Sequence, residues 1–251
     1  MIRTLYLKLF GPIFYRIHNR DRGKKMELGF WNNWLNTCGS QWKEDYVARL
    51  DKNGELRWPH NEIVSMTFHE NYRILDVGSG PITNIGYKLN SLKLDITACD
   101  HNAKEYKHLL KQHGIVPPIE SIAADGESLT KVFKGKYNYI TCKNALDHMK
   151  SPKRCIEEMC TLLADDGIIF LDHEINEGEN EGYRGYHKWN IQRLDYKSFR
   201  IWSPRKEYVL DRETLSLPIR ARNIKGSVLI IISSNRTALE WLDKQDADTL
   251  L

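Results

Sequence analysis

Glycines and polar side chains recur at the ends of successive predicted strands. Gly78, Ser79, Gly80 and Pro81 follow the apolar run 73–77, and Asp100 ends the alternating run 94–99. Glycine backbones let a ligand approach main-chain N–H groups closely. An ionised carboxylate only accepts hydrogen bonds, so one at a strand end can take both hydroxyls of a ribose. This combination predicts a nucleoside-binding site.

Two further clusters follow later strands. Asp125, Gly126 and Glu127 come after a predicted strand over 119–124, and the run 144–148 comes after one over 137–142. Because the carboxyl ends of parallel strands meet at one edge of a sheet, all four clusters are expected to surround one ligand. Thr83 stands where the dinucleotide fingerprint has its third glycine, which argues against a nicotinamide cofactor. A structural alternative for Asp100 is that it caps a helix over 101–113.

The elements that position these residues alternate between strands and helices. A helix is expected to begin after the glycine turn and to run to Leu89. A fifth strand over 168–171 follows a helix that contains Cys155 and Met159. Strands over 198–202, 219–224 and 228–233, with a hairpin turn at Lys225-Gly226, and a C-terminal helix over 238–251 complete the expected α/β fold.

Composition excludes several classes of protein. The chain has 251 residues and a net charge of +4, from 37 basic and 33 acidic residues, which does not by itself indicate a nucleic-acid partner. Five cysteines without a C-x-x-C pair are typical of reduced thiols in a cytoplasmic protein. The longest aliphatic run, 228–232, is far too short to cross a bilayer.

The N-terminal region differs from the rest. Residues 1–25 combine apolar and basic side chains, and a packed arm is favoured over contact with a membrane surface because Gly11-Pro12 interrupts a continuous helix. The aromatic-rich segment 28–50 predicts two short helices that break at Gly39-Ser40, with Ser40 capping the second. We therefore expect an N-terminal arm and helical cap over 1–60 and one α/β domain over 61–251.

The span from Arg73 to about His173 resembles the class I S-adenosylmethionine-dependent methyltransferases, through Ile74-Leu75-Asp76-Val77-Gly78-Ser79-Gly80 and the acids that follow. The resemblance implies a Rossmann-like sheet of seven strands, closed by an antiparallel last strand. It also implies that the loop from Asp76 through Gly78, Ser79, Gly80 and Pro81 wraps the methionine part of S-adenosylmethionine. By the same resemblance Asp100, with His101 beside it, holds the ribose. Asp125, Gly126 and Glu127 would lie by the adenine, and Asn144 near the sulfonium.

The segment 172–190, after the fifth strand, combines acids, histidines, glycines and aromatic residues. A solvated loop is the structural alternative to a substrate loop. Together with the tryptophan-rich region 30–50, it loosely resembles bacterial methyltransferases of surface-polysaccharide and secondary-metabolite pathways, which implies a small hydroxylated acceptor such as a sugar. The expected substrate residues are Trp42, Glu174, Asn176, Glu177, Asn180, Tyr186 and Trp189.

Methyl transfer to an alcohol needs a group that removes the hydroxyl proton, and histidine suits this role. His148, after the fourth strand, is the first candidate, followed by His173 and His187. Asp147, Asp172, His173 and Glu174 are an alternative set of ligands for a divalent cation. Their spacing is not diagnostic, so no metal is expected.

The preferred hypothesis is O-methylation of a small hydroxylated molecule. Methylation of nitrogen or carbon is an alternative, as is a non-catalytic partner protein that keeps a cofactor site. Methylation of RNA is less favoured, because Asn144-Ala145-Leu146-Asp147 stands in place of an Asn/Asp-Pro-Pro-Tyr type of motif and the acidic loop would repel phosphates. The sequence does not indicate an oligomeric state.

Overall fold

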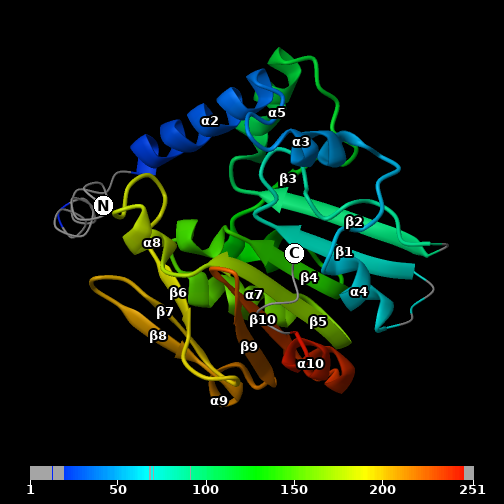
Figure 1. The fold of residues 1–251 in the computed structure, drawn as a ribbon, viewed down its shortest axis with the longest axis vertical. Helices are drawn as coiled ribbons and strands as arrows, with labels where there is room; N and C mark the ends of the chain where they lie inside the picture. Colours follow the sequence, from blue (N-terminus) through cyan, green and yellow to red (C-terminus); the bar gives the residue numbers. More distant parts are fainter. Residues whose placement is uncertain (1–12, 14–19, 68, 70, 91, 246–251) are drawn as a thin grey trace.

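A seven-stranded sheet forms the centre of the molecule (Figure 1). The computed structural model describes residues 13, 20–67, 69, 71–90 and 92–245. In spatial order the strands are β3 (Ile122–Ala123), β2 (Lys93–Asp100), β1 (Asn71–Val77), β4 (Tyr137–Lys143), β5 (Leu163–Glu174), β10 (Ser227–Ser233) and β9 (Ile219–Ile224).

The sheet is mostly parallel. β1 pairs in parallel with β2 and β4, and β4 pairs in parallel with β5. β10 is antiparallel to both β5 and β9. This order and the single reversed strand confirm the predicted Rossmann-like sheet of seven strands, including the hairpin turn at Lys225-Gly226.

Alternation along the strands supplies a core on each face of the sheet, because successive side chains point to opposite faces. On one face Leu75, Ile140 and Ile169 pack with Ile156 and Met159 of α7 (Pro152–Leu162). On the other, Ile74, Tyr139, Phe170 and Ile231 pack with α4 (His60–Ser65) and α10 (Arg236–Asp243). The remaining short helices are η1 (Gly126–Ser128), α6 (Leu129–Val132), η2 (Leu146–His148), α8 (Glu177–Asn180) and α9 (Arg212–Leu215).

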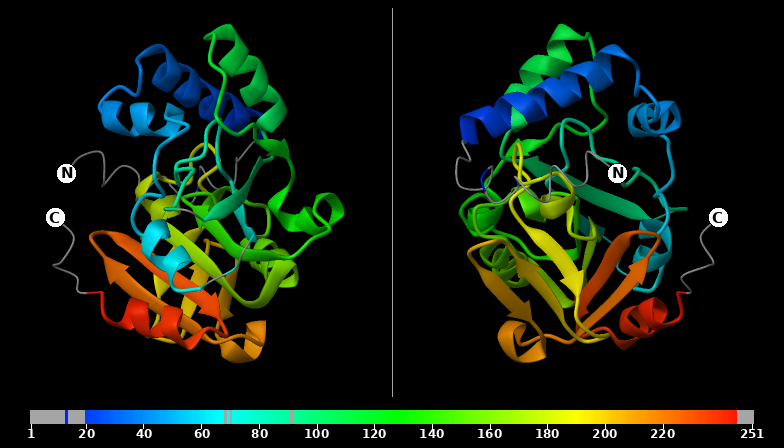
Figure 2. Two further views of the ribbon diagram at one scale, coloured as in Figure 1. Left: turned by 90° about the vertical axis from the view of Figure 1, so that its right-hand side faces the viewer. Right: turned by 60° about the vertical axis from the view of Figure 1, so that its left-hand side comes forward.

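A helical cap made of α2 (Arg20–Asn36) and α3 (Lys43–Leu50) lies beside α5 (Ala103–Gln112) at one end of the molecule (Figures 1 and 2). Trp34 and Leu35 of α2 pack there with Leu109 and Leu110 of α5 and with Ile82. The predicted break at Gly39-Ser40 is confirmed. The predicted cap at Ser40 is wrong, because α3 begins at Lys43 and no side chain caps it.

The helix expected between the glycine turn and Leu89 is absent, because residues 81–90 form turns and single bridges. Their backbone is paired with the segment before α4 instead. The N–H groups of Leu56 and Arg57 donate to the carbonyls of Lys88 and Ile85, and those of Tyr87 and Lys88 donate to the carbonyl of Gly54. Hydrogen bonds to a distant segment thus replace the local ones that a helix would make.

A smaller three-stranded sheet was only partly predicted. It consists of β6 (Asn190–Arg193), β7 (Phe199–Trp202) and β8 (Glu207–Leu210), all antiparallel. The expected strand over 198–202 corresponds to β7, whereas β6 and β8 have no predicted counterpart. The expected third strand over 119–124 is reduced to β3, and the expected helix over 238–251 is α10, with residues 246–251 outside the described part of the chain.

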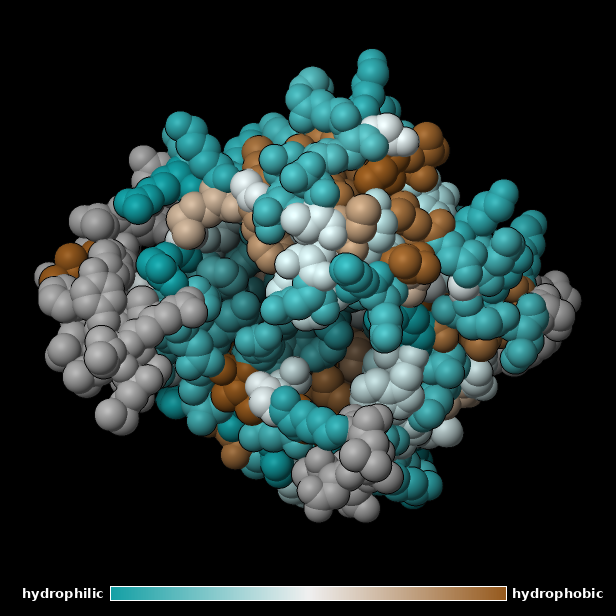
Figure 3. Space-filling view, turned by 45° about the horizontal axis from the view of Figure 1, so that its top comes forward, coloured by the Kyte–Doolittle hydropathy of each residue, from teal (hydrophilic) through white to brown (hydrophobic). Residues whose placement is uncertain are grey.

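Most of the basic N-terminal segment, 1–12 and 14–19, lies outside the described residues, so the arm and its membrane contact stay untested. Among the helices described, none is long and apolar enough to cross a bilayer. Figure 3 shows that the surface on the side of the helical cap mixes hydrophilic residues with smaller hydrophobic patches and is hollowed near the middle of the view.

Candidate active site

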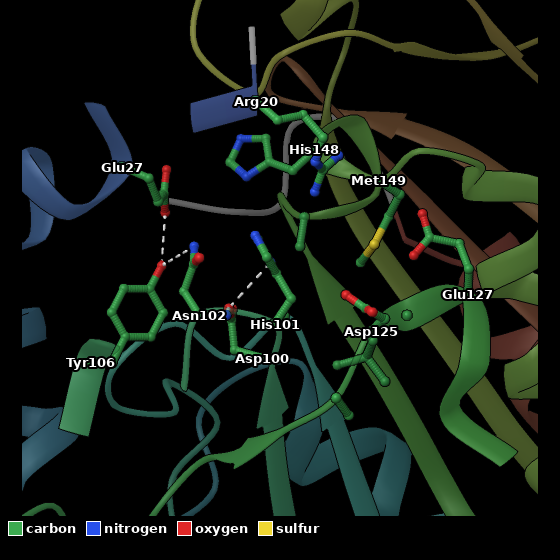
Figure 4. Close-up of a pocket in the computed structure, with 15 residues that line it drawn as sticks. Arg20, Glu27, Asp100, His101, Asn102, Tyr106, Asp125, Glu127, His148 and Met149 are labelled. Atoms are coloured by element: carbon green, nitrogen blue, oxygen red, sulfur yellow. Dashed lines mark hydrogen bonds and ion pairs between the residues drawn. The ribbon is translucent and has the colours of Figure 1, made fainter. Parts of the chain in front are cut away.

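A pocket opens at the carboxyl edge of β1, β2 and β4, beneath α2 (Figure 4). The empty space in and above it is about 470 Å³, which includes open solvent. Its lining residues are Arg20, Glu27, Val77, Gly78, Asp100, His101, Asn102, Tyr106, Ala124, Asp125, Gly126, Glu127, Ala145, His148 and Met149. Every one of the four predicted clusters contributes to this wall.

The glycine turn is built for close approach of backbone. Gly78 has a φ of +75°, and a Cβ there would lie 2.3 Å from the Cβ of Ala145, which follows β4. Gly80 does not line the pocket; a Cβ on it would meet the ring of Trp31 at 2.8 Å. The turn is therefore packed between the fourth strand end and the helical cap.

Asp76, Ser79 and Pro81 support this turn without lining the pocket. The buried carboxylate of Asp76 accepts a 2.6 Å hydrogen bond from the hydroxyl of Thr83, and burial raises the pKa of Asp76 to about 6. The N–H of Ser79 donates to the carbonyl of Cys99, and Pro81 is buried. Asp76 thus links the start of the turn to Thr83, and Ser79 links the turn to β2 through Cys99.

Asp100 lies on the floor of the pocket. One carboxylate oxygen accepts from the N–H of Gly80 at 3.2 Å and the other accepts from the N–H of Asn102 at 2.8 Å. A carboxylate offers about four lone-pair sites, so acceptor capacity remains for a ligand. The helix α5 begins at Ala103 with Asn102 at its cap position, so Asp100 orients the helix start as well as lining the pocket.

The far wall is formed by Asp125, Gly126 and Glu127 with Met149 (Figure 4). A Cβ on Gly126 would lie 2.8 Å from the sulfur atoms of both Met149 and the buried Cys155. One oxygen of Glu127 accepts from the N–H groups of Lys150 and Ser151, at the start of α7. Glu127 therefore also holds the two residues that immediately precede that helix.

Eight of the lining residues were not predicted, and three of these lie on helices. Arg20 and Glu27 come from α2, and Tyr106 comes from α5. The hydroxyl of Tyr106 donates to Glu27 at 3.3 Å, as a dashed line in Figure 4 marks. No local motif distinguishes Arg20 or Glu27 from the other charged residues of the N-terminal segment, since only the fold brings α2 over the pocket.

The residues present fit S-adenosylmethionine. The Nη1 atom of Arg20 and the Oδ1 atom of Asn102 are buried without a hydrogen-bond partner among the described residues, and both residues line the pocket. Asp100 offers an acceptor for hydroxyls, and Val77, Ala124 and Met149 supply apolar contacts beside the polar ones. When bound, this cofactor supplies a methyl group that is already activated on a sulfonium.

Next to this pocket Asp147, His148 and His187 converge. Asp147 Oδ2 lies 2.7 Å from His187 Nδ1 and 3.4 Å from His148 Nε2, and the two ring nitrogens lie 3.3 Å apart. Asp147 and His148 belong to η2, and His187 belongs to the loop after β5. His148 lines the pocket described above, so this cluster and the pocket share a wall.

The charges of neighbouring side chains shift the pKa values of the ionisable groups in this cluster. Burial would raise the pKa of Asp147, yet the charge of His148 and the hydrogen bond from His187 hold it at about 2. Burial alone would lower the pKa of His187, whereas its hydrogen bond to Asp147 and the charge of that carboxylate raise it to about 9. Burial and the charge of Asp147 raise the pKa of Glu177 to about 8. Asp147 and His187 therefore form an ion pair at neutral pH.

His173 lies next to the cluster but is fully buried in β5. Neither of its ring nitrogens has a hydrogen-bond partner within the described chain, and burial lowers its pKa to about 4. Asn144 has a φ of +44°, and its side-chain oxygen accepts from the N–H of Glu174 at 2.9 Å. Neither Asn144 nor Glu174 lines the pocket; at the end of β4 Ala145 does so instead.

The other expected substrate residues are dispersed. Glu177 Oε1 lies 3.6 Å from His187 Nδ1, at the cluster. Trp189 is buried and donates to the carbonyl of Met149, Asn180 donates to the carbonyl of Ile175, and Asn176 has a φ of +57° at the start of α8. Trp42 packs near Phe30 in the helical cap and does not line the pocket.

Tyr186 connects the two parts of the site. Its hydroxyl lies 3.2 Å from His101 Nε2, and its ring packs against His148 at a centroid distance of 5.6 Å. The guanidinium of Arg20 lies over the same ring at 5.2 Å. This loop residue therefore touches His101 and His148 of the pocket wall and Arg20 of the cap.

The strand order, the glycine turn and the acids at one sheet edge define a class I S-adenosylmethionine-dependent methyltransferase. A family model described as a methyltransferase domain matches residues 68–197, just over half of the chain, and the chain belongs to that family. The predicted family, enzyme class and cofactor are thereby confirmed.

Two solved structures illustrate the similarity, which is at low sequence identity. An S-adenosylmethionine-dependent methyltransferase from Clostridium acetobutylicum is 13% identical over 78% of this chain and 98% of its own, with a TM-score of 0.41. An amino pentose methyltransferase from Micromonospora echinaspora, involved in calicheamicin biosynthesis, is 12% identical over 69% of this chain and 87% of its own, with a TM-score of 0.42. No curated protein matches the chain.

Proposed function

We propose that this enzyme transfers the methyl group of S-adenosylmethionine to a hydroxyl oxygen of a small hydroxylated acceptor, such as a sugar or a polysaccharide precursor. The observation that carries the proposal is the cluster of Asp147, His148 and His187 beside the cofactor pocket. An alcohol must lose its proton as its oxygen is methylated, and His148, beside the ion pair of Asp147 and His187, can bind the hydroxyl and receive that proton.

The residues of the pocket take the cofactor in this proposal. Asp100 accepts the ribose hydroxyls, with His101 beside it, and Asp125, Gly126 and Glu127 flank the adenine. Gly78 lets the methionine part approach the backbone of the turn, which Asp76, Ser79, Gly80 and Pro81 support. Asn144 acts indirectly, through its hydrogen bond to the N–H of Glu174 at the end of β5.

The acceptor side is formed by the loop after β5. The hydroxyl lies between His148 and His187, with Glu177 beside them, and Tyr186 separates it from His101. Holding the oxygen in line with the methyl group supplies much of the rate enhancement, because the reaction becomes effectively unimolecular. His173 is less suited to this role than the other two histidines, since its ring is fully buried.

The test is methyl transfer to matched acceptors. The enzyme is incubated with S-adenosylmethionine and sugars, sugar nucleotides or the corresponding amines, and methylated products are identified by mass spectrometry. Asp147→Asn and His187→Gln should each lower kcat for a hydroxyl acceptor by about 10²-fold or more, the usual contribution of proton transfer. Neither residue lines the cofactor pocket, so binding of S-adenosylhomocysteine should be retained.

His108→Gln, on an exposed part of α5, is the matched control and should keep full activity. If amines are methylated in preference to hydroxyls and both cluster variants retain that activity, the enzyme is an N-methyltransferase and the proposal fails. Tight binding of cofactor without turnover on any acceptor would favour the non-catalytic alternative.

A further inference from the structure

The three atoms at the centre of the cluster form a small triangle. Its corners are Asp147 Oδ2, His148 Nε2 and His187 Nδ1, and its sides measure 2.7, 3.3 and 3.4 Å. Around a metal ion with bonds of about 2.0–2.2 Å, neighbouring ligand atoms lie roughly 3.0–3.5 Å apart. The triangle therefore has the size of one face of a metal coordination polyhedron.

Hydrogen bonds alone leave this arrangement incompletely satisfied. The proton on His187 Nδ1 can be donated to Asp147 Oδ2, while His148 Nε2 meets both atoms only at longer distances. The side chain of Asp147 is only 2% exposed, and its Oδ1 atom has no hydrogen-bond partner in the part of the chain described. The neighbouring ring of His173, 1% exposed, also has both nitrogens unpartnered there.

We propose that Asp147, His148 and His187 bind a divalent transition-metal ion. Two imidazoles and one carboxylate suit Zn²⁺, Mn²⁺, Fe²⁺, Co²⁺ or Ni²⁺, whereas Mg²⁺ and Ca²⁺ prefer oxygen ligands only. A cation at the centre of the triangle would engage all three atoms at once. As it binds, the proton that His187 Nδ1 shares with Asp147 Oδ2 would be released to solvent. The candidate set weighed from sequence, Asp147 with Asp172, His173 and Glu174, is not the one that converges, because Asp172 pairs with Lys143 at 2.8 Å and Glu174 is exposed.

The two segments that carry the ligands are held together around the site. The N–H of Lys188 donates to the carbonyl of Asp147 at 3.0 Å, next to the ligand His187. The indole N–H of Trp189 donates to the carbonyl of Met149 at 2.9 Å, next to the ligand His148. These bonds fix the loop after β5 against η2, so the ligand positions are preorganised although 39 residues separate His148 from His187 in the sequence.

Three protein ligands leave coordination positions open. The side chains of His148 and His187 are 16% and 25% exposed, and His148 faces the cofactor pocket. This role rests on the proposed function but changes its proton acceptor, because the nitrogens of His148 and His187 that face the acceptor would now hold the ion. The acceptor hydroxyl would coordinate the ion, which lowers the pKa of the hydroxyl so that its proton passes to solvent. The oxidation state of the ion does not change, and Glu177, 3.6 Å from His187, lies where it can accept a hydrogen bond from the acceptor.

The experiment measures metal binding directly. The full chain is stripped with a chelator, dialysed and titrated with Zn²⁺ by calorimetry and with Co²⁺ by visible absorption. We expect one ion per chain, with Mg²⁺ failing to compete. His148→Ala and His187→Ala should each weaken binding at least tenfold, the order of effect seen when a metal site loses support. His108→Ala should bind as the unaltered chain does, and thermal melting verifies that each variant is folded.

Two outcomes overturn the inference: no Zn²⁺ or Co²⁺ binding below millimolar concentration, or binding that is unchanged in both cluster variants. Activity separates this inference from the proposed function. Full methylation of hydroxyl acceptors by the metal-free enzyme would refute the proposed role of the metal ion and leave the proposed O-methyltransferase function standing. Stoichiometric metal binding that depends on His148 and His187, in an enzyme that methylates only amines, would refute the function and leave the metal site standing.

Discussion

Asp100 Oδ2 accepts a hydrogen bond from the backbone N–H of Gly80 at 3.2 Å, which joins the end of β2 to the turn after β1. The two features from which a nucleoside site was predicted, twenty residues apart, are thus in direct contact. The bond holds the turn in the geometry that exposes Gly78 to the pocket, and it leaves the remaining lone pairs of the carboxylate available to a ligand.

Removing this carboxylate should weaken cofactor binding. We expect Asp100→Ala to raise the Kd for S-adenosylhomocysteine by about 10- to 100-fold, because hydrogen bonds to a charged group contribute about 1.5–3 kcal/mol. Calorimetric titration measures this change. Asp95→Ala, at an exposed position of the same strand, is the control and should bind normally. Equal affinity in the two variants would mean that Asp100 does not contact the cofactor.

Cofactor affinity should depend on pH through Asp100. Burial raises the pKa of Asp100 to about 7, although the N–H groups of Asn102 and Gly80 partly oppose this shift. Only the ionised form accepts from both ribose hydroxyls, so affinity should fall by up to about tenfold for each pH unit below 7. Titrations between pH 5.5 and 8.5 measure the slope. Asp100→Asn should give a flatter profile, and an identical slope in this variant would assign the titration to another group.

The raised pKa of Asp100 should also make the unliganded protein less stable as pH rises through 7. The carboxyl of the unfolded chain has a pKa of 3.8, so it is already ionised at neutral pH, whereas the folded state keeps its proton up to about pH 7. The folded state therefore binds more protons in this window, and the free energy of unfolding falls as pH increases. Thermal melts at pH 6 and pH 8 should differ less for Asp100→Asn than for the unaltered chain. His187, with its pKa raised to about 9, contributes in the same direction in both proteins.

Alanine substitutions at Gly78 and Gly114 distinguish the free-energy cost of backbone strain from that of a steric clash. Both have positive φ, +75° and +66°, but a Cβ on Gly78 meets Ala145 at 2.3 Å and one on Gly114 meets nothing within 4 Å. Gly114→Ala should cost about 1 kcal/mol, or roughly 2–4 °C in Tm. Gly78→Ala should cost more and should also weaken binding of S-adenosylhomocysteine. Similar melting temperatures and similar affinities for the two variants would contradict the packing of the turn against β4.

Strands with an alternating hydrophobic pattern, and turns that contain glycine, were predictable from the sequence. The hairpin of β9 and β10 was predicted almost residue for residue, because Lys225-Gly226 separates two runs with a clear strand pattern. The helix expected before Leu89 failed for a physical reason. The polar and apolar spacing there suits a helix, but the backbone of residues 85–88 pairs with residues 54–57, and no local pattern encodes that pairing.

The candidate site likewise contains residues that the sequence predicted and residues that it did not. Gly78, Asp100 and Asp125 each follow a recognisable strand, so their convergence follows from the topology of a parallel sheet. Asp147 was considered only as a metal ligand, and its pairing with His187 was not predicted. The two residues lie on different loops, and the length of the intervening chain does not set how the second loop folds back. Arg20 and Glu27 were missed because α2 reaches the pocket only through its packing on α5.

Arg49 attaches the helical cap to the glycine turn. Its side chain pairs with Asp45 at 2.7 Å, donates to the carbonyl of Ile82 at 2.8 Å, and lies over Trp31 and Trp34. Arg49→Ala should cost about 1–3 kcal/mol, since it leaves the carbonyl of Ile82 without its donor and removes the packing on the two indole rings. Arg57→Ala removes a more exposed partner of the same carboxylate and should cost less than about 1 kcal/mol. Denaturant unfolding measures both changes, and a comparable loss in the two variants would mean that the buried contacts of Arg49 do not hold the cap.

Tyr186 should couple the cofactor pocket to the acceptor cluster through its ring rather than through its hydroxyl. The ring packs against His101 and His148 and beneath Arg20, and it fits against Gly23 of α2, where a Cβ would lie 2.7 Å from it. Tyr186→Phe keeps these contacts and loses one 3.2 Å hydrogen bond, so kcat should fall less than about tenfold. Tyr186→Ala removes the wall between the two sites. It should lower kcat further, raise KM for the acceptor and cost about 3 kcal/mol or more of stability. Steady-state kinetics with melting curves measure all three, and equal kcat losses in the two variants would show that the hydroxyl carries the coupling.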